Sequence, residues 1–383
     1  MKTDEIYKLP LASAALSAYL LDESLLVYSK NTQNVYGFEK EGAALFLKID
    51  EMVKSRTPEE IAEAFPGVDP AVLKEMVELA SGREELDVVE YEADIEPGRY
   101  VPDEKTRFWY VTESIAYGVH YPDEAFARRI HPVFLHLHTP AEPRHLRNKV
   151  AVDFQEAPEG WVIYWNGKPV QMEVPQPQMA TFLQEKMMTG AYQARKYLIA
   201  LHAGAVEREG RVIVMPATAE SGKTTLIATL VARGFSLFSD EVAALDYEGC
   251  VQPLPFCMNI KEGSWKVLEK EYPELGGRDV HKRFDGQSIR FLPPKNMHAG
   301  PRKASHLLFP TYRPGAKTAL RPLSAKEALA RIKEASYQVQ YNMDERKFEK
   351  ILANLVALPK YELMFSDRDE AVRAIDEMIR LEE

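Results

Sequence analysis

The spacing of apolar positions changes along the chain and separates a first segment, residues 1–85, from the rest of the sequence. The stretches 19–28 (YLLDESLLVY) and 33–38 (QNVYGF) are typical of short strands, and the turn between them is supplied by 30–32 (KNT). Apolar residues then recur at helical spacing over 41–53. The first segment therefore begins with a predicted hairpin that leads into a helix.

Two more helices are predicted in this segment from their capping residues. Thr57 lies directly before Pro58 and three positions before Glu60, which is the pattern of a capping box with a proline in the first turn. The pair at 69–70 (DP) begins a third helix, and the pair at 81–82 (SG) ends it. The predicted order is a hairpin and three helices.

The middle segment, from residue 86 to about 175, is rich in aromatic and turn-forming residues. Strands are predicted at 108–111, 133–137 and 161–165, and a hairpin turn at 166–167 (NG). The second of these strands would place His136 and His138 on one face, which we interpret as hydrogen-bonded or exposed histidines rather than a zinc site. A single helix over 178–200 leads into the last segment.

From residue 201 on, predicted strands and helices alternate as in an α/β layer. The predicted elements are a strand at 211–215, a helix at 223–233 ended by Gly234, a strand at 235–238, a capping box at 324–327, a strand at 361–365 and a helix at 367–381. The pattern favours an α/β fold with three domains. These are an N-terminal domain (1–85), a β-rich segment with a linking helix (86–200) and a C-terminal domain (201–383).

Composition narrows the class of protein. The 383 residues are 45% hydrophobic and 28% charged, which excludes disordered, collagen-like and disulfide-framework chains. The 48 basic and 58 acidic residues give a net charge of −10, so nucleic acid and anionic membranes are not expected partners. No apolar run of 18 residues and no signal peptide is present, and Cys250 and Cys257 are expected to be reduced thiols. A cytoplasmic protein is expected.

The most informative stretch is 211–233 (RVIVMPATAESGKTTLIATLVAR), where a strand runs through a small-residue turn into a helix. Free amides and the dipole at a helix start attract phosphate. Gly222 allows the backbone to approach a phosphate, Lys223 can neutralise it, and the Thr224 hydroxyl can bind Mg²⁺. This order predicts a nucleotide or phosphate site.

Two residues of this loop depart from the G-x-x-x-x-G-K-[ST] pattern. Ala217 occupies the position of the first glycine, and Glu220 places a carboxylate inside the loop. Such a carboxylate has to point away from phosphate or it weakens binding. The alternative is a degenerate loop that preserves the fold and no longer binds.

An acidic pair, Asp240 and Glu241, closes the strand predicted beside the loop strand. Carboxylates at the carboxyl end of such a strand lie at the usual ligand edge of an α/β sheet. One carboxylate can hold Mg²⁺ and the other can accept a proton from an attacking hydroxyl. The alternative is a helix-capping or solvated acidic turn.

In order and spacing, these residues resemble the HPr kinase/phosphorylase superfamily. The resemblance is carried by 201–206 (LHAGAV), the loop, 233–234 (RG) and 239–241 (SDE), with His202 placed 21 positions before Lys223 as in that family. The second acid is usually Asp there and is Glu here. Segments 259–265, 291–294 and 308–312 resemble HPr-kinase-related kinases of bacterial peptide-modification systems. The resemblance covers roughly 195–340. It implies a P-loop-containing core of the HPr-kinase/PEP-carboxykinase type.

The first segment resembles PqqD-like peptide recognition domains, which are winged-helix-like. The resemblance rests on the hairpin with three helices and on the helix start at 57–61 (TPEEI). It implies that a leader peptide is bound by adding a strand to a sheet edge. The alternative is a packing module that binds no peptide.

The superfamily resemblance also implies roles for single residues. Thr224 and Glu241 would hold Mg²⁺, while Asp240 would act as the base toward a serine or threonine hydroxyl and share the metal. His202 would lie near the transferred phosphate. The residues implied to bind the donor, ATP, are Ala219, Glu220, Ser221, Gly222, Lys223, Thr224, Thr225 and Lys261. Arg290 and Arg313 are further candidates for contacts with the acceptor or the donor.

The sequence thus predicts an ATP- and Mg²⁺-dependent kinase that phosphorylates a Ser or Thr hydroxyl, on a ribosomally synthesised precursor peptide held by the N-terminal domain. One alternative is a kinase for a small molecule such as free serine, and another is a non-catalytic peptide-binding pseudokinase. Family members are often hexameric, so a homo-oligomer is an expectation of the resemblance. The sequence leaves open the acceptor, the donor (nucleotide or pyrophosphate) and whether the reaction reverses.

Overall fold

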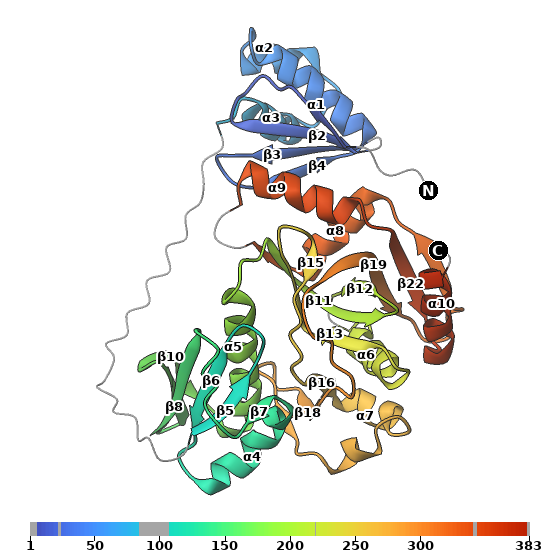
Figure 1. Ribbon diagram of the computed structural model, residues 1–383. Coiled ribbons are helices and arrows are strands. Elements are labelled where there is room, and N and C mark those ends of the chain that lie inside the picture. The colour runs from blue at the N-terminus through green and yellow to red at the C-terminus, as the bar shows by residue number, and fades with distance from the viewer. Residues whose placement is uncertain (1–5, 22–23, 84–106, 219, 340–342, 381–383) are drawn as a thin grey trace. The chain divides into compact units, whose positions relative to one another are not determined.

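The computed structural model describes residues 6–21, 24–83, 107–218, 220–339 and 343–380. The chain forms two compact units (Figure 1). The first consists of Met1–Glu92, Ser324–Ala330 and Val339–Ala357, and the second of Ala93–Leu323, Arg331–Gln338 and Leu358–Glu383. The three predicted domains stay predictions, since these two units reflect spatial contacts alone.

The first unit is built on a four-stranded antiparallel sheet. In spatial order its strands are β1 (Ile6–Leu9), β2 (Leu16–Leu21), β3 (Ser24–Ser29) and β4 (Val35–Phe38). The predicted single strand at 19–28 is therefore wrong, because it comprises most of two paired strands. Leu25 and Val27 of β3 belong to one apolar cluster, and Leu26 and Tyr28 belong to another. In the sequence, the polar residues Asp22 and Glu23 separate the apolar residues of 19–21 from those of 25–28, and the prediction of one strand passed over this break.

Three helices follow the sheet, in the predicted order, and pack on one of its faces. They are α1 (Lys40–Met52), α2 (Pro58–Ala64) and α3 (Pro70–Ala80). The capping box is confirmed, since the Thr57 hydroxyl accepts from the Glu60 amide at 3.3 Å and the Glu60 carboxylate accepts from the Thr57 amide at 2.9 Å. The Asp69 carboxylate caps α3 by accepting from the Ala71 amide at 2.8 Å.

The other face of the sheet is covered from the far end of the chain, by α9 (Glu345–Ile351) and the π-helical turn η4 (Leu352–Val356). The Phe348 ring stacks on Tyr28 at 5.4 Å and meets Tyr19 edge-on at 5.4 Å. The Glu345 carboxylate pairs with the Lys8 ammonium at 2.6 Å, and this contact lowers the pKa of Glu345 to about 2. The N-terminal sheet therefore needs a C-terminal helix to complete its core.

We expect Phe348→Ala to destabilise the first unit by about 3–5 kcal/mol, the usual cost of deleting a buried aromatic ring. Hydrogen exchange followed by mass spectrometry should show lost protection in β2 and β3. All four tryptophans, Trp109, Trp161, Trp165 and Trp265, belong to the second unit, so their fluorescence reports on that unit alone and should stay unchanged.

The matched control is Lys350→Ala, an exposed position on the same helix, which should leave exchange unchanged. Equal protection in both variants would show that α9 does not support the sheet.

The second unit contains a six-stranded sheet and a long helix. The spatial order is β10 (Lys168–Val174), β9 (Gly160–Trp165), β8 (Lys149–Ala157), β6 (Ala116–His120), β5 (Arg107–Val111) and β7 (His138–Thr139). The hairpin turn is confirmed by positive φ angles of 50° at Asn166 and 78° at Gly167. The helix α5 (Met179–Gln193) ends before the predicted residue 200, because Ile199 already begins the next sheet.

The strand predicted at 133–137 is wrong. These residues end α4 (Glu124–Phe134) and form the 3₁₀ turn η1 (Leu135–Leu137). The Asp123 carboxylate caps α4 by accepting from the Phe126 amide at 2.8 Å, and Phe126, Ile130 and Val133 are buried on one helical face. His136 and His138 accordingly do not share a strand face. The ring Nε2 of His136 lies 2.8 Å from the Pro255 carbonyl oxygen.

A nine-stranded mixed sheet carries the loop that the sequence singled out. Its path is β12 (Arg211–Pro216), β11 (Ile199–Arg208), β14 (Val242–Leu245), β15 (Cys250–Val251), β19 (Arg302–Tyr312), β22 (Lys360–Phe365) and β20 (Ala319–Pro322). β13 (Ser236–Ser239) and β21 (Tyr337–Val339) also pair with β11. β12 runs parallel to β19, and β19 to β22. The α/β class is confirmed, but β13 pairs with β11 and not, as expected, directly with the loop strand β12.

The remaining elements complete the second unit and the C-terminal region. They are α6 (Lys223–Ala232), β16 (Met258–Lys261), α7 (Glu262–Leu268), β17 (His281–Lys282), β18 (Ser288–Leu292), α8 (Ala325–Ala335), α10 (Arg368–Arg380) and the 3₁₀ turns η2 (Gln176–Gln178) and η3 (Pro273–Gly277). The capping box predicted at the start of α8 is confirmed, because the Glu327 amide donates to the Ser324 hydroxyl at 3.2 Å and the Ser324 amide donates to the Glu327 carboxylate at 2.8 Å.

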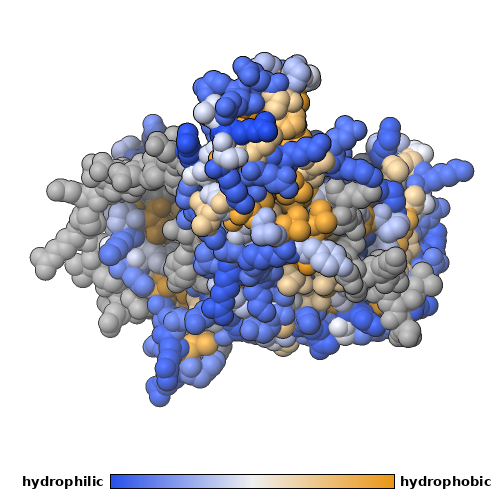
Figure 2. Space-filling model, turned by 90° about the horizontal axis from the view of Figure 1, so that it is seen from above, coloured by the Kyte–Doolittle hydropathy of each residue, from blue (hydrophilic) through white to orange (hydrophobic). Residues whose placement is uncertain are grey.

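The surface and the state of the two cysteines are as the sequence predicts. Among the side chains that are coloured in Figure 2, hydrophilic ones are the most extensive, with apolar side chains showing between them. Within the described ranges, no helix is long and apolar enough to cross a bilayer. Cys250 and Cys257 form no disulfide.

Candidate functional site

The loop between β12 and α6 is held by a glycine and by the end of β19. Gly222 caps α6 with a φ of 82°, and a Cβ atom there would lie 2.8 Å from the Cβ of Tyr312. The Tyr312 amide donates to the Ser221 carbonyl oxygen at 2.9 Å. Only glycine combines this backbone conformation with this close approach. Because glycine has no side chain to cap α6, the free amides at the start of the helix remain open to a ligand.

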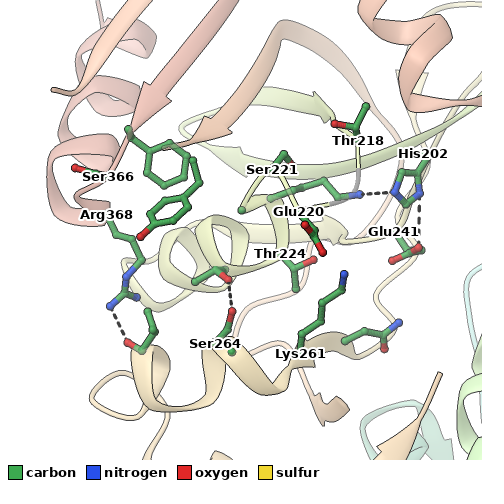
Figure 3. Close-up of a pocket in the computed structure, with 18 of the residues that line it drawn as sticks. His202, Thr218, Glu220, Ser221, Thr224, Glu241, Lys261, Ser264, Ser366 and Arg368 are labelled. Atoms are coloured by element: carbon green, nitrogen blue, oxygen red, sulfur yellow. Dashed lines mark hydrogen bonds and ion pairs between the residues drawn. The ribbon is translucent and has the colours of Figure 1, made fainter. Parts of the chain in front are cut away.

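A second glycine brings α6 against β11. A Cβ atom on Gly204 would overlap the Cδ1 of Ile227. Because the helix can pack this closely, Lys223 at its start reaches His202 on β11, with Nζ 3.5 Å from Nε2. His202 Nδ1 in turn lies 3.6 Å from a carboxylate oxygen of Glu241 (Figure 3). Three side chains, from the start of α6, from β11 and from the turn between β13 and β14, thus form one chain of contacts.

Burial sets the charge states in this chain of contacts. Burial lowers the pKa of Lys223, although the carboxylates of Glu241 and Asp240 oppose the shift. Burial and the nearby Lys223 ammonium lower the pKa of His202 as well. A neutral imidazole can accept a hydrogen bond from the Lys223 ammonium at Nε2 while its Nδ1–H faces the Glu241 carboxylate. His202 therefore orients the ammonium without adding a positive charge.

Asp240 is the buried acid of the site, at 5% exposure. Burial raises its pKa to about 6, although the Lys223 ammonium pulls in the opposite direction. The Thr224 hydroxyl and the Asn259 amide lie near the carboxylate and lower its pKa slightly. Neither reaches hydrogen-bond geometry, and both carboxylate oxygens lack a hydrogen-bond partner among the described residues. A buried carboxylate without donors is set up to receive a proton or a cation.

These oxygen atoms fit a divalent cation. Thr224, Asp240 and Glu241 together offer one hydroxyl and two carboxylates, the donor types that Mg²⁺ prefers. The orphaned oxygens of Asp240 are an independent sign of a missing partner. In the part of the chain that the structure describes, no group of three or more His, Cys, Asp and Glu side chains could hold a metal by itself. Phosphate oxygens and water would have to complete the ligand shell.

One cavity of about 380 Å³ unites most of the predicted site residues. Residues 220–225 line it together with His202, Glu241 and Lys261 (Figure 3). Asp240 is buried and is not among the lining residues. Ala219 falls outside the described residues. The structure thus brings the predicted residues together, and their chemical roles stay predictions.

The departures in the loop have a structural account. Ala217 is not among the residues with positive φ, so its backbone does not require the usual glycine. Glu220 does have a positive φ, of 65°, and it lines the cavity. Its carboxylate and that of Glu241 oppose phosphate. Four cationic side chains line the same cavity, those of Lys223, Lys261, Arg283 and Arg368. The balance of charge still favours an anion.

The structure adds residues that sequence reasoning missed. Arg283, which pairs with Asp285 at 3.5 Å, lines the cavity although it lies far from the loop in the sequence. Ser264 also lines it, and its hydroxyl lies 2.7 Å from the Thr225 hydroxyl. Arg368 is a further lining residue. No local pattern marks these residues, because only the fold brings them to the loop.

The two arginines proposed from the sequence do not line the cavity. Arg290 stacks over the Trp265 ring at 4.2 Å and donates to the Leu275 carbonyl oxygen at 3.1 Å. Arg313 is likewise absent from the cavity walls. The structure therefore supports neither as a donor contact.

Comparisons with known proteins add little to this geometry. No protein-family model matches the chain, and no curated protein matches it. Among solved structures, the chain is similar to the HPr(Ser) kinase/phosphatase from Coxiella burnetii, at 10% identity and a TM-score of 0.23, over 48% of this chain and 99% of that chain. A TM-score this low does not establish a shared fold, so the functional assignment has to come from the site itself.

Proposed function

We propose that this chain is a kinase that transfers a phosphoryl group from ATP to a serine or threonine hydroxyl. The observation that carries the proposal is the convergence of Lys223, His202 and Glu241 at one helix start, with the donor-free carboxylate of Asp240 directly beside them. A helix start with a buried ammonium binds phosphate. A carboxylate next to it supplies a proton acceptor for a hydroxyl.

Each side chain has a distinct task in this reaction. Lys223, Lys261 and Arg283 neutralise the phosphates, and the amides at the start of α6 orient them. His202 holds the Lys223 ammonium in place. Asp240 accepts the proton of the attacking hydroxyl. Thr224, Asp240 and Glu241 would hold Mg²⁺, which when bound neutralises charge on the phosphates.

The proposed acceptor is a precursor peptide bound by the first unit. β1 and β4 are the outer strands of its sheet, and an extended peptide can add to an outer strand through main-chain hydrogen bonds. A small-molecule kinase and a non-catalytic peptide-binding pseudokinase are the competing proposals.

Intact-mass analysis tests the reaction directly. Candidate peptides encoded beside this gene are incubated with the full chain, Mg²⁺ and either ATP or pyrophosphate. We expect one added phosphoryl group with ATP and none with the Lys223→Ala variant. A peptide that binds equally well to both proteins and is never phosphorylated would establish the pseudokinase instead.

Peptide truncation separates the two kinase proposals. Removing the leader segment from a phosphorylated peptide should raise KM with little change in kcat if the first unit holds that segment. Equal KM values for both peptides, together with phosphorylation of free serine, would favour the small-molecule kinase.

The pH dependence of kcat/KM should show an acidic limb near pH 6. Burial raises the pKa of Asp240 to about 6, and only the ionised carboxylate can accept a proton. We expect kcat/KM to fall about tenfold per pH unit below that value, since kcat/KM reports groups of the free enzyme. Initial rates between pH 5 and 8 at constant ionic strength measure the profile. A flat profile would contradict the assignment of Asp240 as the base.

A further inference from the structure

A second cavity lies in the same unit, away from the loop. It measures about 270 Å³, near the lower end of the range for ligand pockets. Arg129, Pro132 and Val133 of α4 form one wall. The opposite wall is formed by residues 277–279, by His281 of β17 and by Phe291 of β18. It shares no lining residue with the cavity at the loop.

Three buried nitrogen atoms of this cavity's side chains have no hydrogen-bond partner among the described residues. They are Nε of Arg129, Nε of Arg278 and Nδ1 of His281. His281 is only 2% exposed, so water reaches it poorly. Buried polar groups in folded proteins are nearly always paired. Two unpaired guanidinium N–H groups, beside a ring nitrogen that donates in its Nδ1–H tautomer, therefore indicate a missing partner that supplies acceptor atoms.

The charges around the cavity favour an anion. Neither Arg129 nor Arg278 has a carboxylate within ion-pair distance among the described residues, whereas the neighbouring Arg128 pairs with Glu124 at 2.7 Å. Asp279 is the acid of the lining, and it is exposed. Burial and the Arg129 guanidinium lower the pKa of His281 to about 4, so the ring is neutral at pH 7. Guanidinium groups recognise carboxylate and phosphate through paired N–H donors.

We propose that Arg129, Arg278 and His281 form a binding site for the oxyanion group of a small carboxylated or phosphorylated ligand. The arginines neutralise the oxyanion and the unpaired nitrogens find acceptors on it. Pro132, Val133 and Phe291 contact the carbon part of the ligand. The site is independent of the kinase proposal, because it uses none of the residues assigned to phosphoryl transfer.

Calorimetric titration of the full chain tests the site with two probes, inorganic phosphate and succinate. The protein carries Lys223→Ala, so that the loop does not contribute phosphate binding. We expect saturable binding of at least one probe, weakened at least tenfold by Arg129→Gln and by Arg278→Gln. The control Arg128→Gln lies on the same helix with a 74% exposed side chain and should bind normally.

The outcome identifies the ligand class. If only phosphate binds, the ligand is phosphorylated. If only succinate binds, the ligand is carboxylated. If both bind, the site accepts either oxyanion. No saturable binding of either probe, or equal weakening by Arg128→Gln, overturns the proposal.

Thermal unfolding without ligand tests whether the substitutions weaken binding only because they destabilise the protein. Because the Nε atoms of Arg129 and Arg278 are unpaired, neither Gln variant should lower the midpoint of the ligand-free protein. A lower midpoint would show that these arginines stabilise the fold and would contradict the site. When Lys223 is left intact, the same variants should bind nucleotide normally, which separates failure of this site from failure of the kinase proposal.

Discussion

Replacing Asp240 with asparagine should lower phosphoryl transfer by about 10³-fold, which is within the usual contribution of a positioned proton acceptor. The amide retains the shape of the side chain but cannot accept the proton of an attacking hydroxyl. Donor binding measured without Mg²⁺ should change much less, because Lys223 and the amides at the start of α6 are untouched, whereas Asp240 is one of the side chains proposed to hold the metal. Steady-state kinetics and nucleotide titration measure the two effects separately.

The same substitution should make the protein more stable at pH 8. The folded state holds the pKa of Asp240 at about 6, above its ordinary value of 3.8, so it binds this proton more tightly than the unfolded chain does. Stability from this group is present at low pH and is lost as pH rises from about 4 to 6. At ~1.4 kcal/mol per pKa unit, Asp240→Asn should recover on the order of 2–3 kcal/mol at pH 8 and almost nothing at pH 4.

Chemical denaturation at pH 4 and pH 8 measures the gain in the free energy of unfolding. Asp367→Asn is the matched control, since Asp367 is exposed and caps α10 by accepting from the Glu370 amide at 2.8 Å, which asparagine also does. It should alter neither turnover nor stability. Wild-type turnover in Asp240→Asn, or a loss of stability at pH 8, would contradict the role of a buried, unpaired base.

Gly222→Ala should weaken donor binding by about 10- to 100-fold, equivalent to about 1.4–2.7 kcal/mol. The new Cβ would lie 2.8 Å from the Cβ of Tyr312, an atom close to the backbone that cannot swing aside. The φ of 82° is also unfavourable for alanine. The loop has to shift, and the amides that gather the phosphates shift with it. Titration with ATP and Mg²⁺ measures the loss.

Gly263→Ala is the matched control for this substitution. Gly263 lines the same cavity, has no φ in the left-handed region and has nothing within 4 Å of an added Cβ. It should bind the donor normally. Equal affinities for the wild type and Gly222→Ala would mean that the loop does not contact the donor.

Local signals in the sequence were sufficient for much of the fold. The capping box at Thr57, the turn at 166–167 and the helix that starts at Lys223 each depend on residues a few positions apart, and all are confirmed. The strand predicted at 133–137 is wrong because a short apolar run fits a strand or a buried helix end equally well. The two strands within 19–28 were predicted as one because the polar residues Asp22 and Glu23 between them were not taken as a turn.

For the candidate site, the order of residues along the chain was enough to single out the loop and the acidic pair, because both lie within one stretch, and His202 was added by the family resemblance alone. Three other features became visible only in the folded chain. Arg283 joins the loop cavity, α9 closes the N-terminal sheet, and Arg129, Arg278 and His281 share a second cavity. The burial of a side chain and the charged groups beside it depend on which distant segments pack together. No short sequence pattern encodes that packing.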